Sequence, residues 1–220
     1  MDGQTMNRQL FNRLEEIGKI RLSQNFYLRD FLYSEIAIAH NLINIPNDLE
    51  LAIASGSELC EKILEPLQNA WGRIHIRSGY RSPQVNEFGN MNKLNCASND
   101  KNYAGHIWDV RDKANNIGAT ACIVIPRYVD YFRKTGDWAS LAWWIHHNIP
   151  EYDNITFFAS NAAFNIRWYD TKNKEKTIKS FATNPDTEDK KNILNKGVIH
   201  EFYVNKTAEK RFYKCLNLMM

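Results

Sequence analysis

Residues 74–86, IHIRSGYRSPQVN, carry the strongest structural signal in the chain. Side chains alternate over residues 73–77 and place Ile74 and Ile76 on the same side, which is typical of a half-buried β-strand. A serine and a glycine end the alternation, Arg81 follows in the turn, and the stretch closes on the start of a helix. It therefore predicts a strand, a turn that carries an arginine, and a helix.

Two helices are predicted ahead of this stretch. Residues 5–22 place leucine and isoleucine at helical spacing. A longer apolar pattern begins after Asn47 and Asp48, either of which is a suitable N-cap, and runs over residues 49–67. Because proline lacks a backbone N–H, Pro66 is expected to kink or end this second helix.

Beyond the stretch, the chain mixes short strands with one clear helix. Residues 86–105 are rich in Asn, Gly, Ser and Lys and predict a long loop. Apolar or alternating runs predict strands at residues 121–125, 155–158, 163–168 and 199–204. Asp137 is expected to cap a helix, and the polar residues 172–196 predict a surface excursion. We therefore expect an α+β fold with a small antiparallel sheet flanked by helices.

The segment at residues 74–86 resembles the strand-and-turn signature of the zinc D-Ala-D-Ala carboxypeptidase-like peptidases, which share their fold with the Hedgehog signalling domain. The resemblance covers about residues 25–126, since the preceding helix ending LCEKILEPLQ and an early aromatic segment also fit. It implies a Hedgehog/DD-peptidase-like fold. The expected parts are an N-terminal helical extension (1–24), a peptidase-like domain (25–170) and a C-terminal extension that completes the domain (171–220).

In that family the arginine of the motif lies in the active site. The resemblance therefore implies that Arg81 holds a substrate carboxylate or polarises the scissile carbonyl. A planar guanidinium suits this role because it can donate two parallel hydrogen bonds to a carboxylate. The alternative is that Arg81 pins its own turn to a nearby carboxylate. Ser78 and Tyr80, from the same motif, are also predicted to contact substrate, although Tyr80 equally suits a packing role.

The resemblance also implies zinc, which the family holds with two histidines and one aspartate and with water in the fourth position. In the segment AGHIWDVRD, residues 104–112, His106 is the counterpart of the first histidine ligand. Lys113 stands where the family has its aspartate, and Asp109 and Asp112 are close but out of register. The predicted zinc ligands are His106, Asp109 and Asp112.

A second alignment treats residues 107–118 as an insertion. It places GATAC, residues 118–122, over the end of the family motif, so that Cys122 replaces the aspartate. A thiolate can bind zinc, but a buried cysteine can equally be inert. The third ligand, a late histidine in the family, falls on Asn165 or Tyr169. The remaining late histidines are His146, His147 and His200.

Two functions follow from these residues. The first is a zinc peptidase that cuts cell-wall peptide near a D-Ala terminus, which requires a metal to activate water and a carboxylate to take its proton. The second is a catalytically inactive module that binds peptidoglycan peptide or builds a phage particle. Its expected partners are peptidoglycan peptide and phage structural proteins, the latter through exposed aromatic residues such as Trp143 or Trp144.

Composition excludes other classes of function. The chain has 220 residues, of which 44% are hydrophobic and 24% charged, an ordinary balance for a globular domain. Its net charge of +3 includes no long run of Lys or Arg, which argues against nucleic acid as a partner. No apolar stretch approaches the ~20 residues of a membrane span, and residues 1–22 lack the apolar core of a signal peptide. We therefore expect a soluble protein, located in the cytoplasm or in a phage virion.

Overall fold

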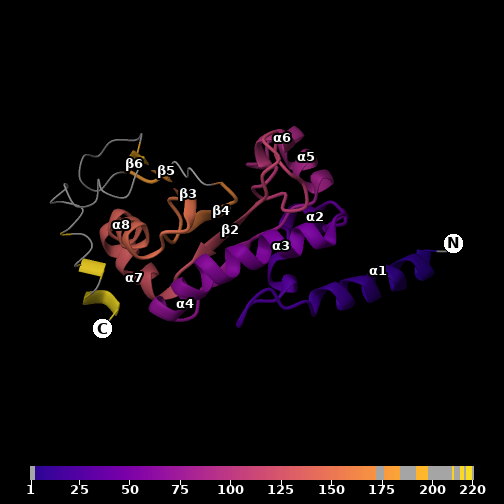
Figure 1. Ribbon diagram of the computed structural model, residues 1–220, viewed down its shortest axis with the longest axis horizontal. Coiled ribbons are helices and arrows are strands. Elements are labelled where there is room, and N and C mark those ends of the chain that lie inside the picture. The colour runs from indigo at the N-terminus through magenta and orange to yellow at the C-terminus, as the bar shows by residue number, and fades with distance from the viewer. Residues whose placement is uncertain are drawn as a thin grey trace.

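The computed structural model describes residues 3–171, 176–183, 192–197, 210, 214–215 and 217–219. These residues form an α+β fold in which a six-stranded sheet packs against helices, with α1 leading away from the body toward the N-terminus (Figure 1). The strand order is β1-β2-β4-β3-β5-β6, and every neighbouring pair is antiparallel except β3 and β5. The predicted fold class is therefore confirmed, with one parallel pair that was not expected.

The strands are β1 (His75–Ser78), β2 (Gly118–Val124), β3 (Tyr152–Phe157), β4 (Phe164–Tyr169), β5 (Lys176–Ser180) and β6 (Asn192–Gly197). The α-helices are α1 (Gly3–Gly18), α2 (Glu35–Ala39), α3 (Leu49–Leu59), α4 (Glu65–Trp71), α5 (Pro83–Met91), α6 (Asn99–Asn102), α7 (Pro126–Thr135) and α8 (Ala139–Asn148). A 3-10 helix, η1 (Leu28–Phe31), and a π-helical turn, η2 (Cys60–Leu64), complete the elements.

The sheet has an apolar face and a polar face, because successive side chains of a strand point to opposite sides. On the apolar face, directly opposed residues form hydrophobic rows such as Ala121, Ile166, Ile155 and Ile178. Helix α3 packs against β2 on this side. On the polar face, the register produces a row that crosses five strands: Ser78, Cys122, Asn165, Thr156 and Lys179.

Helix α3 begins as predicted, and the chain then passes Pro66 without leaving the helix. The Asp48 carboxylate accepts a hydrogen bond from the backbone N–H of Leu51 at 2.9 Å, which makes Asp48 the N-cap. Of the two predicted effects of Pro66, a kink or an end, the end is wrong, since α4 continues to Trp71. The π-helical turn η2 immediately precedes the proline and shifts the backbone pairing by one residue, so that Pro66 falls in the first turn of α4, where a missing N–H is tolerated.

The predicted loop at residues 86–105 is partly helical, which corrects the prediction. Helix α5 runs to Met91, and its N-cap is Ser82, whose hydroxyl accepts from the backbone N–H of Val85 at 3.3 Å. The asparagines that suggested a loop instead bond the backbone of the folded segment. Asn90 Nδ2, for example, donates to the carbonyl of Cys96 at 2.8 Å. A composition rich in asparagine therefore marked side-chain-to-backbone bonding rather than irregular chain.

The predicted surface excursion at residues 172–196 is also corrected, because it contains strands β5 and β6 at one end of the sheet. Strand β5 has one apolar core residue, Ile178, among lysines, threonine and serine, so its alternation is weak in the sequence. It is held by backbone pairing with β3, a contact distant in the chain. Both strands lie in the predicted C-terminal extension, and the strand predicted at 199–204 lies outside the described residues.

The remaining predicted elements are confirmed. Strands β3 and β4 are the antiparallel pair predicted near residues 155–168. Asp137 precedes Trp138, the N-cap of α8, and its Oδ1 accepts from the backbone N–H of Ser140 at 3.0 Å, which stabilises the first turn. The expectation that Trp143 or Trp144 is exposed is wrong, since both side chains of α8 are buried. No helix among the described residues is long and apolar enough to cross a membrane.

Candidate functional site

The candidate site lies on the polar face of the sheet, beside the end of β1. Ser78 and Asn165 lie opposite Cys122 on its two sides in the sheet. The turn after β1 brings Arg81, and the loop before β2 brings His106. Backbone hydrogen bonds join these two segments, since the N–H of Arg81 donates to the carbonyl of His106 at 2.8 Å. Residues far apart in the sequence therefore meet at one place.

His106 is buried, with 5% of its surface exposed, and has a defined tautomer. Its Nδ1 lies 2.9 Å from the carbonyl oxygen of Gly79, which can only accept, so Nδ1 carries the hydrogen. Nε2 is buried and has no hydrogen-bond partner among the described residues. Burial, followed by the positive charge of Arg81, lowers the pKa of His106 to about 3, although the Gly79 bond opposes the shift. The imidazole is therefore neutral at physiological pH.

Arg81 is half-buried, and only one end of its guanidinium is occupied. Nη1 donates to Asn86 Oδ1 at 3.2 Å and to Cys96 Sγ at 2.9 Å. Nε and Nη2 donate to no described residue, and Arg81 forms no ion pair within the described part of the chain. The structure thus gives no carboxylate to which Arg81 pins its own turn, and it leaves one edge of the cation available.

Cys122 stands where the second alignment expected a zinc ligand, and Asn165 is one of the two residues onto which the late ligand fell. The register of β2 and β4 places them directly opposite each other. Burial raises the pKa of the Cys122 thiol to about 11, although the nearby charges of Arg77 and Arg81 oppose the shift. The thiol is therefore protonated at neutral pH and weakly reactive. Cys60 is likewise buried.

Tyr80 is part of the core and does not face a ligand. Its side chain is fully buried, and its ring packs edge-on against Trp108 with centroids 6.2 Å apart. The hydroxyl donates to the carbonyl of Ile45 at 3.4 Å. Burial, followed by the negative charge of Asp109, raises the pKa of Tyr80. Of the three motif residues predicted to contact substrate, Tyr80 therefore packs in the core. Ser78 and Arg81 lie at the candidate site.

Asp112 is engaged in local structure, whereas Asp109 bonds a distant segment through one oxygen and its buried Oδ1 has no hydrogen-bond partner among the described residues. Asp109 Oδ2 accepts from the backbone N–H of Asn47 at 2.8 Å. Asp112 Oδ1 accepts from the backbone N–H groups of Ala114 and Asn116, and its Oδ2 accepts from the hydroxyl of Tyr169. Although burial opposes the shift, these hydrogen bonds lower the pKa of Asp112. Asp112 therefore closes its own turn against β4.

The described residues do not fit a zinc ion. No group of three or more His, Cys, Asp or Glu side chains within the described residues is arranged to hold a metal. His106 Nε2 and Asp109 Oδ1 are buried potential ligand atoms without a hydrogen-bond partner, but no third His, Cys, Asp or Glu among the described residues joins them in a metal-binding group. A catalytic zinc needs three protein ligands. We therefore derive no hydrolytic step through a metal.

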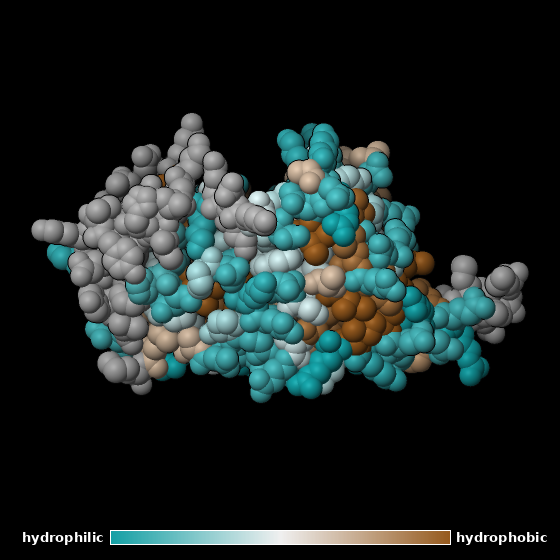
Figure 2. Space-filling view, in the orientation of Figure 1, coloured by the Kyte–Doolittle hydropathy of each residue, from teal (hydrophilic) through white to brown (hydrophobic). Residues whose placement is uncertain are grey.

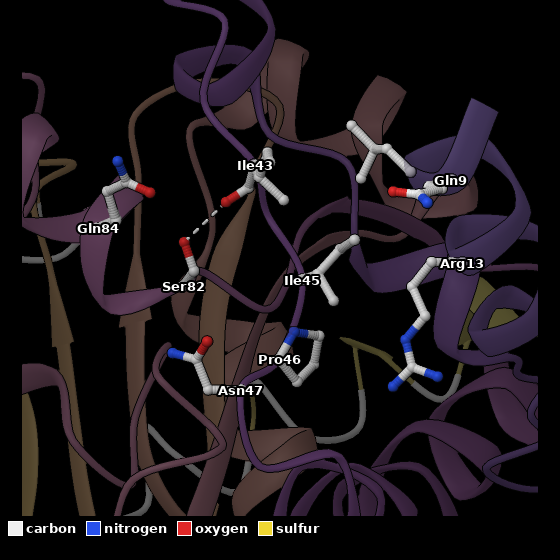
Figure 3. Close-up of a pocket in the computed structure, with 9 residues that line it drawn as sticks. Gln9, Arg13, Ile43, Ile45, Pro46, Asn47, Ser82 and Gln84 are labelled. Carbon is white, nitrogen blue, oxygen red and sulfur yellow. Dashed lines mark hydrogen bonds between the residues drawn. The ribbon is translucent and has the colours of Figure 1, made fainter. Parts of the chain in front are cut away.

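A separate hollow of about 530 Å³ lies between α1 and the segment before α3 (Figure 3). Its apolar lining comes from Leu10, Ile43, Ile45 and Pro46, with Gln9, Arg13, Asn47, Ser82 and Gln84 also lining it. Hydrophobic surface also gathers over the region of α1 in Figure 2, and Phe11 and Leu14 are exposed on that helix. None of the predicted site residues lines this hollow, so it is distinct from the candidate site.

Three residues that support the site were not predicted from the sequence. Asn86 was identified only as part of a helix start, and Cys96 and Asn102 fell within the predicted loop. All three are bonded to Arg81 or to each other. The cluster of asparagines across residues 86–102 was the sequence feature that could have indicated these supporting residues. An amide side chain can both donate and accept, and so can link groups that the backbone leaves unpaired.

Comparison of the chain with protein-family models, with curated proteins and with solved structures finds no match. The resemblance to the zinc carboxypeptidase-like family therefore stays an expectation drawn from the motif residues.

Proposed function

We propose that this chain is a divergent member of the zinc D-Ala-D-Ala carboxypeptidase-like family that recognises peptidoglycan peptide by its terminal carboxylate and does not cut it. The motif at residues 74–86 supports the family, and the α+β fold is compatible with it. The groups around His106 support binding rather than hydrolysis, since the described residues contain no group of three side chains arranged to hold a metal.

The observation that carries the proposal is the unpaired edge of Arg81. A half-buried guanidinium without an anion is an unsatisfied charge, and a ligand carboxylate would complete it with charge-assisted hydrogen bonds. His106 and Cys122 are themselves neutral, and the negative charge that acts on Cys122 comes from Glu35. Ser78 and Asn165, on the adjacent polar face, supply further hydrogen-bonding groups.

Replacement of Arg81 should abolish selective binding. We expect an N-acetylated L-Lys-D-Ala-D-Ala peptide to bind the wild-type protein, and Arg81→Gln to weaken that binding roughly 10- to 100-fold, because a hydrogen bond to a charged group contributes about 1.5–3 kcal/mol. Arg81→Lys should bind with intermediate affinity, since lysine keeps the charge but loses the planar fork. Isothermal titration calorimetry measures each affinity.

Arg77→Gln is the matched control. Arg77 lies in β1, the strand before the Arg81 turn, is exposed, and also lies near Cys122, so the substitution removes the same charge without touching the proposed carboxylate site. Its affinity should stay within about 3-fold of wild type, because exposed charges are screened by solvent. The proposal is wrong if Arg81→Gln binds the peptide like wild type, or if a peptide with an amidated C-terminus binds as tightly as the free acid.

Metal content separates this proposal from the peptidase. We expect purified wild-type protein dialysed against zinc-containing buffer to retain well under one zinc per chain, and His106→Ala to retain the same amount. Elemental analysis by mass spectrometry measures both. About one zinc per wild-type chain, lost in His106→Ala, would contradict a metal-free site and would favour the peptidase.

A further inference from the structure

We infer that Asn86 is the positioning residue that holds Arg81 for its ligand, so that a carboxylate must approach the Nε–Nη2 edge of the guanidinium. The inference rests on the proposed function, because it specifies how the same arginine takes its ligand. It concerns a residue that contacts Arg81 and not the ligand.

The Asn86 side chain is fully buried and uses its whole hydrogen-bonding capacity. Its Oδ1 accepts from Arg81 Nη1 at 3.2 Å and from Asn102 Nδ2 at 2.9 Å. Its Nδ2 donates to the carbonyl of Ala97 at 3.0 Å and to Asn99 Oδ1 at 2.8 Å. A primary amide has two donor hydrogens and two acceptor lone pairs, so the group is satisfied on every side.

The orientation of this amide follows from chemistry. The guanidinium of Arg81 can only donate, and the backbone carbonyl of Ala97 can only accept. The oxygen of Asn86 must therefore face Arg81, and the nitrogen must face the segment at residues 97–99. A flipped amide would place two donors against each other and two acceptors against each other, which is costly in a buried site.

Asn86 also connects Arg81 to the loop that carries His106. Asn102, which donates to Asn86, accepts at its backbone carbonyl from the N–H groups of Gly105 at 2.9 Å and Ile107 at 3.0 Å. The His106 carbonyl in turn accepts from the Arg81 backbone N–H. Arg81 is thus held through its side chain and its backbone by the same bonded unit.

The remaining geometry of Arg81 decides the direction of approach. Nη1 carries two hydrogens, and both are used, one toward Asn86 and one toward Cys96. The Nε hydrogen and the two Nη2 hydrogens have no acceptor among the described residues. The Nε–Nη2 edge presents two parallel N–H groups, which match both oxygens of a carboxylate. A ligand therefore binds side-on.

The test compares Asn86→Ala with Asn86→Asp, using the full chain and the N-acetylated L-Lys-D-Ala-D-Ala peptide. Asn86→Ala removes the support, and we expect affinity to fall about 10-fold as Arg81 becomes free to turn. Asn86→Asp keeps the acceptor but adds a negative charge next to Nη1, and we expect an equal or larger loss because the ligand carboxylate is repelled. Circular dichroism checks that each variant is folded.

Asn90→Ala is the matched control, since Asn90 lies one turn later in α5 and bonds the carbonyl of Cys96 without touching Arg81. It should bind the peptide like wild type. The readout specific to positioning is the ¹⁵N–¹H spectrum of the arginine side chain. We expect separate Nη1 and Nη2 signals for Arg81 in wild type and Asn90→Ala, and averaged signals in Asn86→Ala. Peptide should shift the Nε and Nη2 signals of wild type and leave Nη1 unchanged.

The outcomes separate this inference from the proposed function. If Arg81→Gln binds the peptide like wild type, the proposed function fails. If binding depends on Arg81 but Asn86→Ala retains wild-type affinity and separate Nη signals, only the role of Asn86 fails. A peptide-induced shift at Nη1 instead of Nε would overturn the side-on approach.

Discussion

Gly118→Ala is expected to destabilise the protein by about 3 kcal/mol or more, the upper part of the range for overpacked cores. A Cβ atom on Gly118 would lie 2.3 Å from the carbonyl oxygen of Ala104 and 2.9 Å from that of Trp168. Both neighbours are backbone atoms, so neither can rotate away as a side chain would. The Ala104 carbonyl belongs to the loop that carries His106, and the N–H of Thr120 bonds that loop at Gly105. The substitution should therefore also disturb the candidate site.

Urea denaturation followed by circular dichroism measures this loss, and Gly136→Ala is its control. Gly136 has open space around its Cβ position but a backbone φ of +68°, so alanine there costs only the left-handed conformation, about 1–2 kcal/mol. Gly118→Ala should be the more destabilising of the two. Equal losses would show that the approach of Ala104 to Gly118 can relax.

Acid should destabilise the wild-type protein through His106. The histidine takes up a proton near pH 6.5 when unfolded but only near pH 3 when folded. Between these values the unfolded state binds more protons, so stability falls as the pH falls. Between pH 6.5 and pH 4.5 this group alone should reduce the free energy of unfolding by about 2 kcal/mol. The loss should continue down to about pH 3, where the folded protein also becomes protonated.

His106→Asn isolates this contribution. The asparagine amide can still donate to the Gly79 carbonyl, as His106 Nδ1 does, but it does not titrate. Wild type and variant share every other ionisable group, so the difference between their pH profiles reports His106. We expect the variant to lose about 2 kcal/mol less than wild type between pH 6.5 and pH 4.5. Parallel profiles would mean that His106 titrates normally in the folded protein.

Much of the fold was accessible from local sequence patterns. The alternation at residues 73–77 predicted β1, and the cap at Asp48 predicted the start of α3. The wrong predictions at Pro66 and at residues 172–196 have a common cause. In both, the structure is stabilised by a feature that the residues themselves do not encode in their hydrophobic pattern. The π-helical turn η2 accommodated Pro66, and pairing with β3 ordered the lysine-rich β5. Neither the π-helical turn nor the strand pairing produces a hydrophobic periodicity that could be recognised in the sequence.

The candidate site was accessible only in part. Arg81 and His106 were implied by the resemblance to the peptidase family, and the structure brings them together through the bond between their backbones. The first alignment assigned a ligand role to Asp112, yet that carboxylate bonds Tyr169 and its own turn. The second alignment put Cys122 in place of the aspartate, and the late ligand fell on Asn165 or Tyr169; the strand register places Asn165 opposite Cys122. Spacing alone could not decide between the two alignments. They differ in whether residues 107–118 are an insertion, and either choice places a residue able to bind metal near the aspartate position.

The sequence by itself determined the class of fold, the strand and turn that carry Arg81, and the chemical types available to the site. Those features depend on residues a few positions apart, where hydrophobic periodicity and capping act. The tertiary structure decided which groups are free to bind. It left one edge of Arg81 open, buried His106 in its neutral form and assigned Asn86 to the guanidinium. Hydrogen-bond partners and burial come from segments distant in the chain, and these set the charge and accessibility of every group at the site.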